Sequence, residues 1–253
     1  MRYAFAGDRN ISCKLLKFLI SKGHNPLALL ISEGLNATHD QQLIEIANLS
    51  DGNVFQGNDF KLQENIEKLK NLELDYIFGV HFPYIIPSEV LNIPKVGFLN
   101  IHPAYLPYNK GWHTPTWSIL DNSSYGATLH FMEEALDQGN IIHQKKLKVL
   151  PTDTANSLYQ RVLKLEEEVF YEAFADLVSL QPKRQPQIGK GTTHVKRDLH
   201  KIQEIDLNTP MAPMLLINKL RALTTNKISE LAYFEIDGKR IGVKVDLIDL
   251  DEE

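Results

Sequence analysis

The chain is 253 residues long, with 43% apolar and 23% charged residues, which is enough to bury one sizeable core and to carry a small additional module. Its formal net charge of −5 argues against a nucleic-acid-binding protein, because such proteins neutralise phosphates with an excess of Lys and Arg. Cys13 is the only cysteine, so an internal disulfide and a thiolate metal cluster are both excluded. The sequence also lacks a signal-like segment and an apolar run of about 18 residues, and we therefore expect a cytoplasmic protein without a membrane partner.

Short apolar runs alternate with stretches of helical periodicity in the first hundred residues. We expect strands at 3–6, 27–32, 53–55, 75–80 and 98–102, and helices at 10–23, 43–47 and 60–72. Helices that connect consecutive strands form βαβ units, which build a parallel sheet covered by helices on both faces. The sequence therefore predicts an α/β fold with a Rossmann-like core and a mostly parallel sheet.

The pattern changes after residue 122. Residues 125–132 and 140–150 alternate between apolar and polar and are expected to pair as a hairpin, with 133–139 as the connection. One long amphipathic helix is expected at 154–180. These elements complete a main domain that we place at residues 1–180.

The rest of the chain divides into a linker and a small module. Residues 181–200 are polar and contain two prolines and two glycines, which is typical of a linker. Residues 201–253 are expected to hold a helix near 213–223 and a β-hairpin turned by Asp237 and Gly238, so they form a small C-terminal α+β module.

Ligands of parallel sheets bind where loops leave the carboxyl ends of the strands. The first such loop, AGDRN at 6–10, has a single glycine, so the dinucleotide fingerprint and the P-loop are absent and neither NAD nor ATP is expected. Arg9 and Asn10 can meet an anion at the start of the following helix, where N–H groups and the helix dipole favour negative charge. Alternatively, Asn10 or Ser12 only caps that helix.

Asn100 and His102 end a strand and lie two residues apart, so both side chains point to one face, and Pro103 prevents the strand from continuing. No Gly-x-Ser-x-Gly motif occurs, and no cysteine accompanies the histidine, which excludes serine and cysteine hydrolysis. The spacings typical of zinc sites are also missing, although His81, His102 and His113 can converge in the fold. We expect no metal.

Three stretches together resemble one family. NIHPAYLP at 100–107, preceded by YIIP and followed by GATLHFMEEALDQG at 126–139, is similar to the folate-dependent formyltransferases, which include glycinamide ribonucleotide transformylase and methionyl-tRNA formyltransferase. The resemblance covers roughly residues 1–180, which it implies to be a catalytic N-formyltransferase domain. The family's catalytic asparagine, histidine and aspartate fall on Asn100, His102 and Asp137.

The resemblance implies a mechanism without metal. An amine attacks the formyl carbon of N10-formyltetrahydrofolate, and the Asn100 amide N–H stabilises the oxygen that gains charge. His102 takes the proton that the amine loses, while Asp137 orients the imidazole and stabilises its charged form. Whether His102 or Asp137 carries the proton, directly or through water, stays open.

The resemblance also places the folate. In this family the pterin ring lies between the loop that matches 82–87 and the loop that begins at Glu133. The implied folate-binding residues are Phe82, Tyr84, Ile85, Ile86 and Glu133.

The amine that receives the formyl group is suggested by the remainder of the chain. Residues 201–253 hold seven Lys and Arg against ten Asp and Glu, which would repel a tRNA. The stretch HPAYLPYNKGWHTPTW and the appended module are similar to sugar-nucleotide N-formyltransferases, which act on dTDP- or GDP-linked amino-deoxysugars for lipopolysaccharide O-antigen and other cell-surface polysaccharides. The alternatives are another small amine, as in glycinamide ribonucleotide formylation, and a folate-binding protein without turnover.

Substrate contacts are expected from two places. Arg9, Asn10 and Lys110 are the candidates for binding the diphosphate, and Trp112 and His113 follow the catalytic strand closely enough to border the sugar. The C-terminal module is too small to bury a core by itself and must dock on its own domain or on a second subunit. By analogy with the sugar enzymes, we expect a homodimer.

Overall fold

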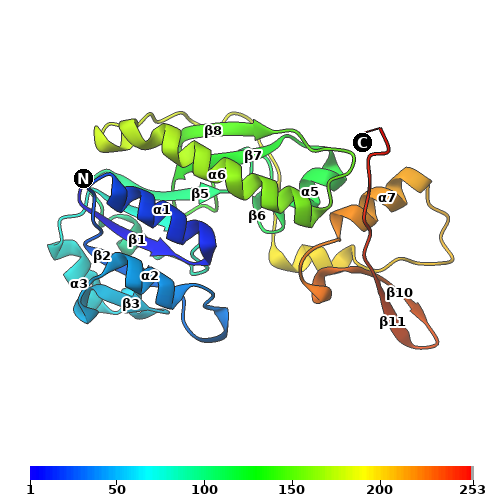
Figure 1. Ribbon diagram of the computed structural model, residues 1–253, viewed down its shortest axis with the longest axis horizontal. Helices are drawn as coiled ribbons and strands as arrows, with labels where there is room; N and C mark the ends of the chain where they lie inside the picture. Colours follow the sequence, from blue (N-terminus) through cyan, green and yellow to red (C-terminus); the bar gives the residue numbers. More distant parts are fainter. Residues whose placement is uncertain (252–253) are drawn as a thin grey trace. The chain divides into compact units, whose positions relative to one another are not determined.

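The computed structural model describes residues 1–251 of the chain. They form two compact units, each assembled from three segments. Unit 1 consists of residues 1–102, 128–144 and 166–187, and unit 2 consists of residues 103–127, 145–165 and those from 188 onward. Figure 1 shows the chain coloured from blue at the N-terminus to red at the C-terminus.

A seven-stranded sheet has the strand order β3-β2-β1-β4-β5-β7-β8. Its strands are β1 (Tyr3–Gly7), β2 (Ala28–Ile31), β3 (Val54–Gln56), β4 (Tyr76–Val80), β5 (Gly97–His102), β7 (Tyr125–Phe131) and β8 (Ile141–Leu147). The first five are parallel, and β7 runs antiparallel to β5. The expected α/β fold with a mostly parallel sheet is confirmed.

Helices connect the parallel strands, as the periodicity predicts, and α1, α2 and α3 lie along the blue and cyan strands in Figure 1. The helices up to residue 178 are α1 (Arg9–Ser21), α2 (Asp40–Ala47), α3 (Gln63–Asn71), α4 (Ser88–Leu91), α5 (Thr114–Asp121) and α6 (Ala155–Val178). Helix α3 begins later than expected, because Asp59–Lys61 form a 3-10 turn and Leu62 is extended. Within residues 1–251, none of the helices combines the length and the apolar character that crossing a bilayer requires.

The core of unit 1 forms where strands are covered on both faces. Every residue of β1, β2 and β4 is buried, which explains why these strands are continuous apolar runs rather than alternating ones. Helix α1 adds an aromatic contact to the second half of α6, since the Phe18 ring lies 5.1 Å from Phe174 and 6.4 Å from Phe170. The apolar face of α1 is thereby held against its neighbours.

The strand order switches between the parallel neighbours β1 and β4, since β2 and β3 lie on one side of β1 and the later strands on the other, and such a switch point is the usual place for a ligand crevice in this class of fold. Gly7 lies in register with Val80, and Val80 with Ile101, so the carboxyl ends of β1, β4 and β5 meet at one edge. Ser12 Oγ of α1 donates to the Val80 carbonyl at 2.8 Å and ties the first two of these ends together. The loops that carry Arg9 and the stretch 81–87 start from this edge.

Unit 2 contains the C-terminal elements, which run from yellow to red in Figure 1. They are β9 (Thr193–His194), two 3-10 turns (Lys196–Lys201 and Ile228–Glu230), α7 (Pro213–Ala222), and the hairpin of β10 (Ala232–Ile236) and β11 (Lys239–Val243). The short strand β6 (Lys110–Gly111), which comes earlier in the chain, pairs with β9. The expected C-terminal helix and antiparallel hairpin are confirmed.

Helix α7 docks on earlier residues of its own chain within unit 2. Thr116 Oγ1 of α5 donates to the Ala222 carbonyl at 2.8 Å, and the Asn156 backbone N–H donates to the Thr224 carbonyl at 3.0 Å. On α5, Trp117 is 8% exposed and stacks on His194 with ring centroids 3.9 Å apart, so it is a core residue.

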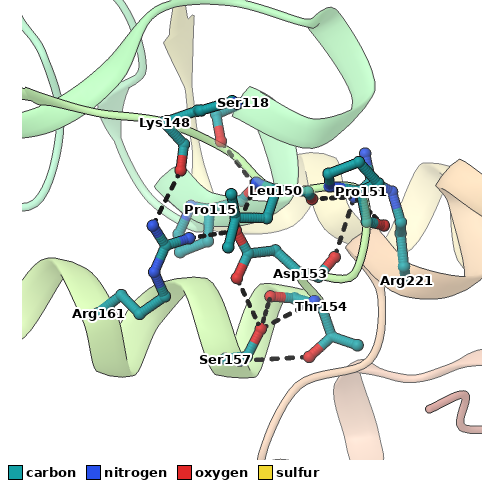
Figure 2. Close-up of polar contacts among 10 residues, drawn as sticks. All are labelled: Pro115, Ser118, Lys148, Leu150, Pro151, Asp153, Thr154, Ser157, Arg161 and Arg221. Atoms are coloured by element: carbon teal, nitrogen blue, oxygen red, sulfur yellow. Dashed lines mark hydrogen bonds and ion pairs between the residues drawn. The ribbon is translucent and has the colours of Figure 1, made fainter. Parts of the chain in front are cut away.

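A buried aspartate organises the start of α6, as Figure 2 shows. The Asp153 carboxylate accepts from the Leu150 backbone N–H at 2.7 Å, from Ser157 Oγ at 3.0 Å and from the Arg161 guanidinium. Arg221 of α7 donates to three carbonyl groups of the same loop at 2.9, 3.0 and 3.1 Å. Asp153 and Arg221 together connect the loop, α6 and α7.

We predict that Asp153→Ala lowers the free energy of unfolding by about 3 kcal/mol, because it removes the acceptor of the part-buried Leu150 N–H, of Ser157 Oγ and of one Arg161 nitrogen, which leaves Arg161 only the Lys148 carbonyl. Chemical denaturation followed by circular dichroism measures the change. Asp246→Ala, which removes an exposed carboxylate of the same unit, is the matched control and should change stability by less than about 0.5 kcal/mol. Equal effects of the two substitutions would contradict the role of Asp153.

Candidate active site

The carboxyl end of β5 carries Asn100 and His102 on one face of the sheet. The antiparallel pairing with β7 places His130 opposite Asn100 and Thr128 opposite His102. His102, Thr128 and His130 are buried. Polar side chains from two strands therefore converge where a core would normally be apolar.

Asp137 reaches this cluster from the loop between β7 and β8. Its Oδ2 lies 3.5 Å from His102 Nε2, and the two side chains are 9% and 8% exposed. Its backbone is left-handed, with φ of 51°, a conformation that costs energy in a residue with a side chain and is often found at functional sites. The structure thus brings together Asn100, His102 and Asp137, which lie up to 37 positions apart in the sequence.

His130 is a further member of the cluster that sequence reasoning missed. Its Nδ1 lies 2.8 Å from the Phe131 carbonyl, which can only accept, so Nδ1 carries the proton and Nε2 is the acceptor in the neutral ring. Nε2 lies 3.5 Å from Asn100 Nδ2 and 3.7 Å from Asp137 Oδ1. The signal for it was the alternation of 125–132, which puts residues 128 and 130 on one face.

Burial keeps His130 neutral. Its full burial lowers the pKa of the imidazole to about 4, more than the nearby Asp137 carboxylate raises it. The neutral ring with an unprotonated Nε2 turns the Asn100 amide so that its NH₂ group, not its oxygen, faces His130. The second hydrogen of that group can then be donated to a ligand.

The predicted folate loop is built on aromatic packing. The rings of Phe82 and Tyr84 lie 5.0 Å apart, and both pack against Phe60 of the core at 5.6 and 6.2 Å. Ile85 leaves 85% of its surface exposed, whereas Ile86 is 9% exposed and lies in the core. An exposed isoleucine beside two half-buried rings offers an apolar wall for a flat ligand.

Glu133 is exposed and borders a cavity of unit 1. The cavity has a volume of about 410 Å³, and its lining residues are Leu91, Asn92, Met132, Glu133, Glu134 and Ala135. Four of these six residues belong to the loop that also supplies Asp137, so that loop forms one wall of the cavity.

A contact between a histidine and a buried carboxylate anchors the other predicted folate loop. His81 Nε2 lies 3.0 and 3.1 Å from the two oxygens of Glu166, a residue of α6 that is fully buried. His81 itself is left-handed, with φ of 52°, and directly precedes Phe82. Since a buried carboxylate needs a partner, this pair fixes where the loop leaves β4.

Arg9 and Asn10 lie at the start of α1 and are exposed. Asp8, not Asn10 or Ser12, is the N-cap residue, so the capping alternative for those two residues is wrong. Asp8 is 1% exposed and accepts from Thr38 Oγ1 at 2.7 Å. It holds the neighbouring loop, and Arg9, at a left-handed φ of 72°, places its half-exposed guanidinium Nε 3.6 Å from Asp8 Oδ2.

Lys110, Trp112 and His113 belong to unit 2. Lys110 is 7% exposed and pairs through its backbone with β9, whereas Trp112 is 47% exposed with Lys196 Nζ 5.5 Å from the centroid of its ring. His113 Nδ1 lies 3.9 Å from Glu230, and burial lowers the pKa of its imidazole although that carboxylate opposes the shift. Trp112 and Lys196 thus form an exposed aromatic and cationic pair.

The described residues contain no cluster of side chains suited to a metal ion. Within residues 1–251, no three or more His, Cys, Asp or Glu side chains are grouped so that they could hold an ion. His81 is paired with Glu166, and His102 with Asp137.

Comparison with known proteins identifies relatives of two kinds. The dTDP-4-amino-4,6-dideoxyglucose formyltransferase of Mycobacterium bovis is 28% identical over 171 residues, which cover 68% of this chain and 72% of that protein. The methionyl-tRNA formyltransferase of Francisella philomiragia is 30% identical over 199 residues, which cover 76% of this chain and 63% of that protein.

Solved structures share the fold over nearly the whole chain. A 4-N formyltransferase from Francisella tularensis superposes with a TM-score of 0.82 at 25% identity, covering 98% of both chains. The sugar 3N-formyl transferase WlaRD, solved in the presence of dTDP and 5-N-formyl-THF, has a TM-score of 0.69 at 21% identity and covers 97% of this chain and 94% of its own.

Two family models match separate parts of the sequence. The model described as the N-formyltransferase dimerization C-terminal domain matches residues 198–249. The model described as Formyl transferase matches residues 24–174, more than half of the chain. On this match and on the fold, the chain belongs to the formyl transferase family of enzymes.

Proposed function

We propose that this protein transfers a formyl group from N10-formyltetrahydrofolate to the amine of a nucleotide-linked amino-deoxysugar. The observation that carries the proposal is the convergence of the half-buried Asn100 with His102 and Asp137 around His130, with the His102–Asp137 pair 3.5 Å apart. The curated relative that acts on a dTDP-linked aminosugar supports the choice of substrate.

His102 is the proposed acceptor of the proton that the amine loses when it attacks the formyl carbon. The imidazole lies at the end of β5, where the sheet edge opens to a ligand, and Asp137 stabilises the charge that the ring acquires. A pair with both side chains less than 10% exposed interacts more strongly than a pair in water.

Asn100 is the proposed donor to the formyl oxygen as that oxygen gains charge. Its amide is turned by the neutral His130, so one hydrogen of the NH₂ group faces His130 Nε2 and the other is directed elsewhere. A single fixed donor of this kind is worth about 3 kcal/mol in the transition state. His130 therefore acts as a positioning residue for Asn100.

The folate fits the loop at 82–87. Folate supplies the activated formyl group, and the chain must hold a flat, partly apolar ring next to Asn100. The exposed Ile85 side chain and the half-buried rings of Phe82 and Tyr84 suit such a ring, and Glu133 borders the cavity beside the opposite loop. We propose these residues as the folate contacts, with Ile86 supporting them from the core, and we propose no metal.

A sugar nucleotide suits the rest of the chain better than a tRNA does. Residues 201–253 carry seven Lys and Arg against ten Asp and Glu, whereas binding a tRNA needs a basic surface. Arg9 and Asn10 at the start of α1 are proposed to meet the diphosphate, as is Lys110. Trp112, half exposed beside Lys196, is proposed with His113 to border the sugar nucleotide. The product would serve cell-surface polysaccharide such as O-antigen.

We further propose a catalytic domain at 1–180, a linker at 181–200 and a C-terminal module at 201–253 through which two subunits form a homodimer. The match of residues 198–249 to a dimerization domain supports the dimer. The outer side chains of α7 and the hairpin remain apolar and exposed, among them Met214 at 64%, Ile236 at 50% and Ile241 at 45%. Such side chains are typical of a surface that a partner covers.

The substrate is tested with a panel of dTDP-, GDP- and UDP-linked sugars that carry a 3-amino or 4-amino group. We expect one of them to gain the mass of a formyl group in the presence of N10-formyltetrahydrofolate, read by mass spectrometry. Formylation of glycinamide ribonucleotide or of methionyl-tRNA instead of every sugar nucleotide would refute the substrate class. Binding of folate without any transfer would refute the enzyme activity.

We predict that His102→Asn and Asp137→Asn each lower kcat by about 10²- to 10⁴-fold without loss of fold, since both act on proton transfer rather than on packing. His143→Asn is the matched control, because it removes an exposed histidine–carboxylate pair with Glu172 in the same unit. It should keep the wild-type rate. Wild-type rates in either of the first two variants would contradict the assigned roles.

We predict that His130 makes the protein sensitive to acid. The pKa of its imidazole is about 4 in the folded protein and about 6.5 in the unfolded chain, so its contribution is complete above pH 6.5 and is lost as the pH falls toward 4. The lost contribution is about 3 kcal/mol. Between pH 7 and pH 4, the wild type should therefore lose about that much more stability than His130→Gln, as measured by denaturant unfolding at each pH. Parallel losses in the two proteins would contradict a neutral His130.

A further inference from the structure

Residues 184–187, which lie in the proposed linker, form a strap over unit 1. Arg184 donates to the Val96 carbonyl at 2.7 Å, and its guanidinium lies 3.7 Å from the centroid of the Phe131 ring. Gln185 forms an antiparallel bridge with Ile141, with N–H···O distances of 2.7 and 2.9 Å. The strap is thus fixed to the ends of β7 and β8 immediately before it reaches Gln187.

The Gln187 side chain forms two hydrogen bonds to the loop between β7 and β8, which carries Asp137. Its Nε2 donates to the carbonyl of Asp137 at 2.8 Å and to the carbonyl of Gly139 at 2.9 Å. Both hydrogens of the NH₂ group are used, and the Oε1 atom is buried without a hydrogen-bond partner among the described residues. The reverse orientation would place an oxygen against two carbonyl oxygens, so the amide can sit only one way.

These two hydrogen bonds matter because the backbone of the loop adopts an unfavourable conformation. Asp137 has a φ of 51°, and Gly139 passes so close to β7 that an added Cβ would lie 1.9 Å from the Phe131 carbonyl oxygen. Conformations of this kind persist only where surrounding contacts outweigh their cost. Gln187 ties the carbonyls on either side of residue 138 and thereby selects the loop geometry in which the Asp137 side chain faces His102.

We propose that Gln187 is a positioning residue for catalysis, which acts by clamping the Asp137 loop. The inference rests on the proposed formyl transfer, because Asp137 matters for rate only if His102 accepts a proton. Gln187 touches neither His102 nor the reacting atoms in this role. Its effect on the reaction passes through the position of the Asp137 carboxylate.

The chain offers a matched pair of variants. Gln187→Leu keeps the side-chain volume and removes both N–H donors. Gln185→Leu makes the same change two residues earlier in the strap, at an exposed side chain whose residue is held through its backbone. Gln187→Glu is the second test variant, because it keeps the shape and sets carboxylate oxygens against the two carbonyl groups.

The experiment measures kcat, both KM values, the melting temperature and hydrogen exchange of the peptide at 132–141. We expect Gln187→Leu and Gln187→Glu to lower kcat by about 10- to 100-fold, since a small displacement of a catalytic group has that effect, with KM for folate and for the sugar nucleotide within about threefold. Exchange at 132–141 should rise about tenfold. Gln185→Leu should match the wild type in every measurement.

Each outcome decides the proposal. Equal kcat and equal exchange in the Gln187 and Gln185 variants would overturn it, as would a rise in KM with kcat unchanged. Unfolding of both Gln187 variants while Gln185→Leu stays folded would make Gln187 a folding residue and would also overturn it. If the wild type forms no formylated sugar nucleotide, the proposed function fails, and the exchange at 132–141 alone then decides whether Gln187 clamps the loop.

Discussion

The antiparallel pairing of β5 with β7 is the constraint on which the candidate site depends. It sets His130 opposite Asn100, and it returns the chain so that the loop after β7 delivers Asp137 to His102. A slip of one residue would turn every side chain of β7 to the other face and would separate the cluster. The close passage of Gly139 against the Phe131 carbonyl separately fixes the path of the loop after β7, because no larger residue fits there.

The two loops that face the site are supported in different ways. The loop after β4 is anchored by the contact of His81 with the fully buried Glu166 carboxylate of α6. The loop after β7 is anchored by neutral hydrogen bonds from Gln187 to two backbone carbonyls. A neutral donor such as the Gln187 amide suits the loop after β7, since a cation there would compete with His102 for the negative charge of Asp137.

The order of strands and helices could be predicted because apolar periodicity is a local property of the sequence. The shared face of Asn100 and His102 followed from their spacing alone. Asp137 could be assigned only by resemblance, since its approach to His102 depends on a loop 35 residues away in the sequence. His130 was missed because its contact with Asn100 requires the register between β5 and β7, which neither strand encodes by itself.

The contacts of the segment at 181–200 were also beyond what the sequence could predict. Its prolines, glycines and polar residues predict an irregular backbone, and the structure is indeed irregular over most of it. Composition does not reveal which groups such a backbone meets. The partners of Arg184 and Gln187 lie 48 to 88 residues earlier in the sequence, so an apparently plain connection holds part of the site in place.

Two histidine rings lie close to the Asp137 carboxylate, and burial decides which of them can pair with it as a cation. At close range a carboxylate attracts an imidazolium by several kcal/mol in a poorly solvated site, yet the pKa of the fully buried His130 still falls to about 4. The cost of desolvating a charged His130 therefore exceeds the attraction. At neutral pH its Nε2 lone pair is directed to the Asn100 amide, and the negative charge of Asp137 remains for His102, the nearer ring at 3.5 Å against 3.7 Å. In the proposed mechanism, one buried ring thus orients the Asn100 donor, while the other is left to receive a proton.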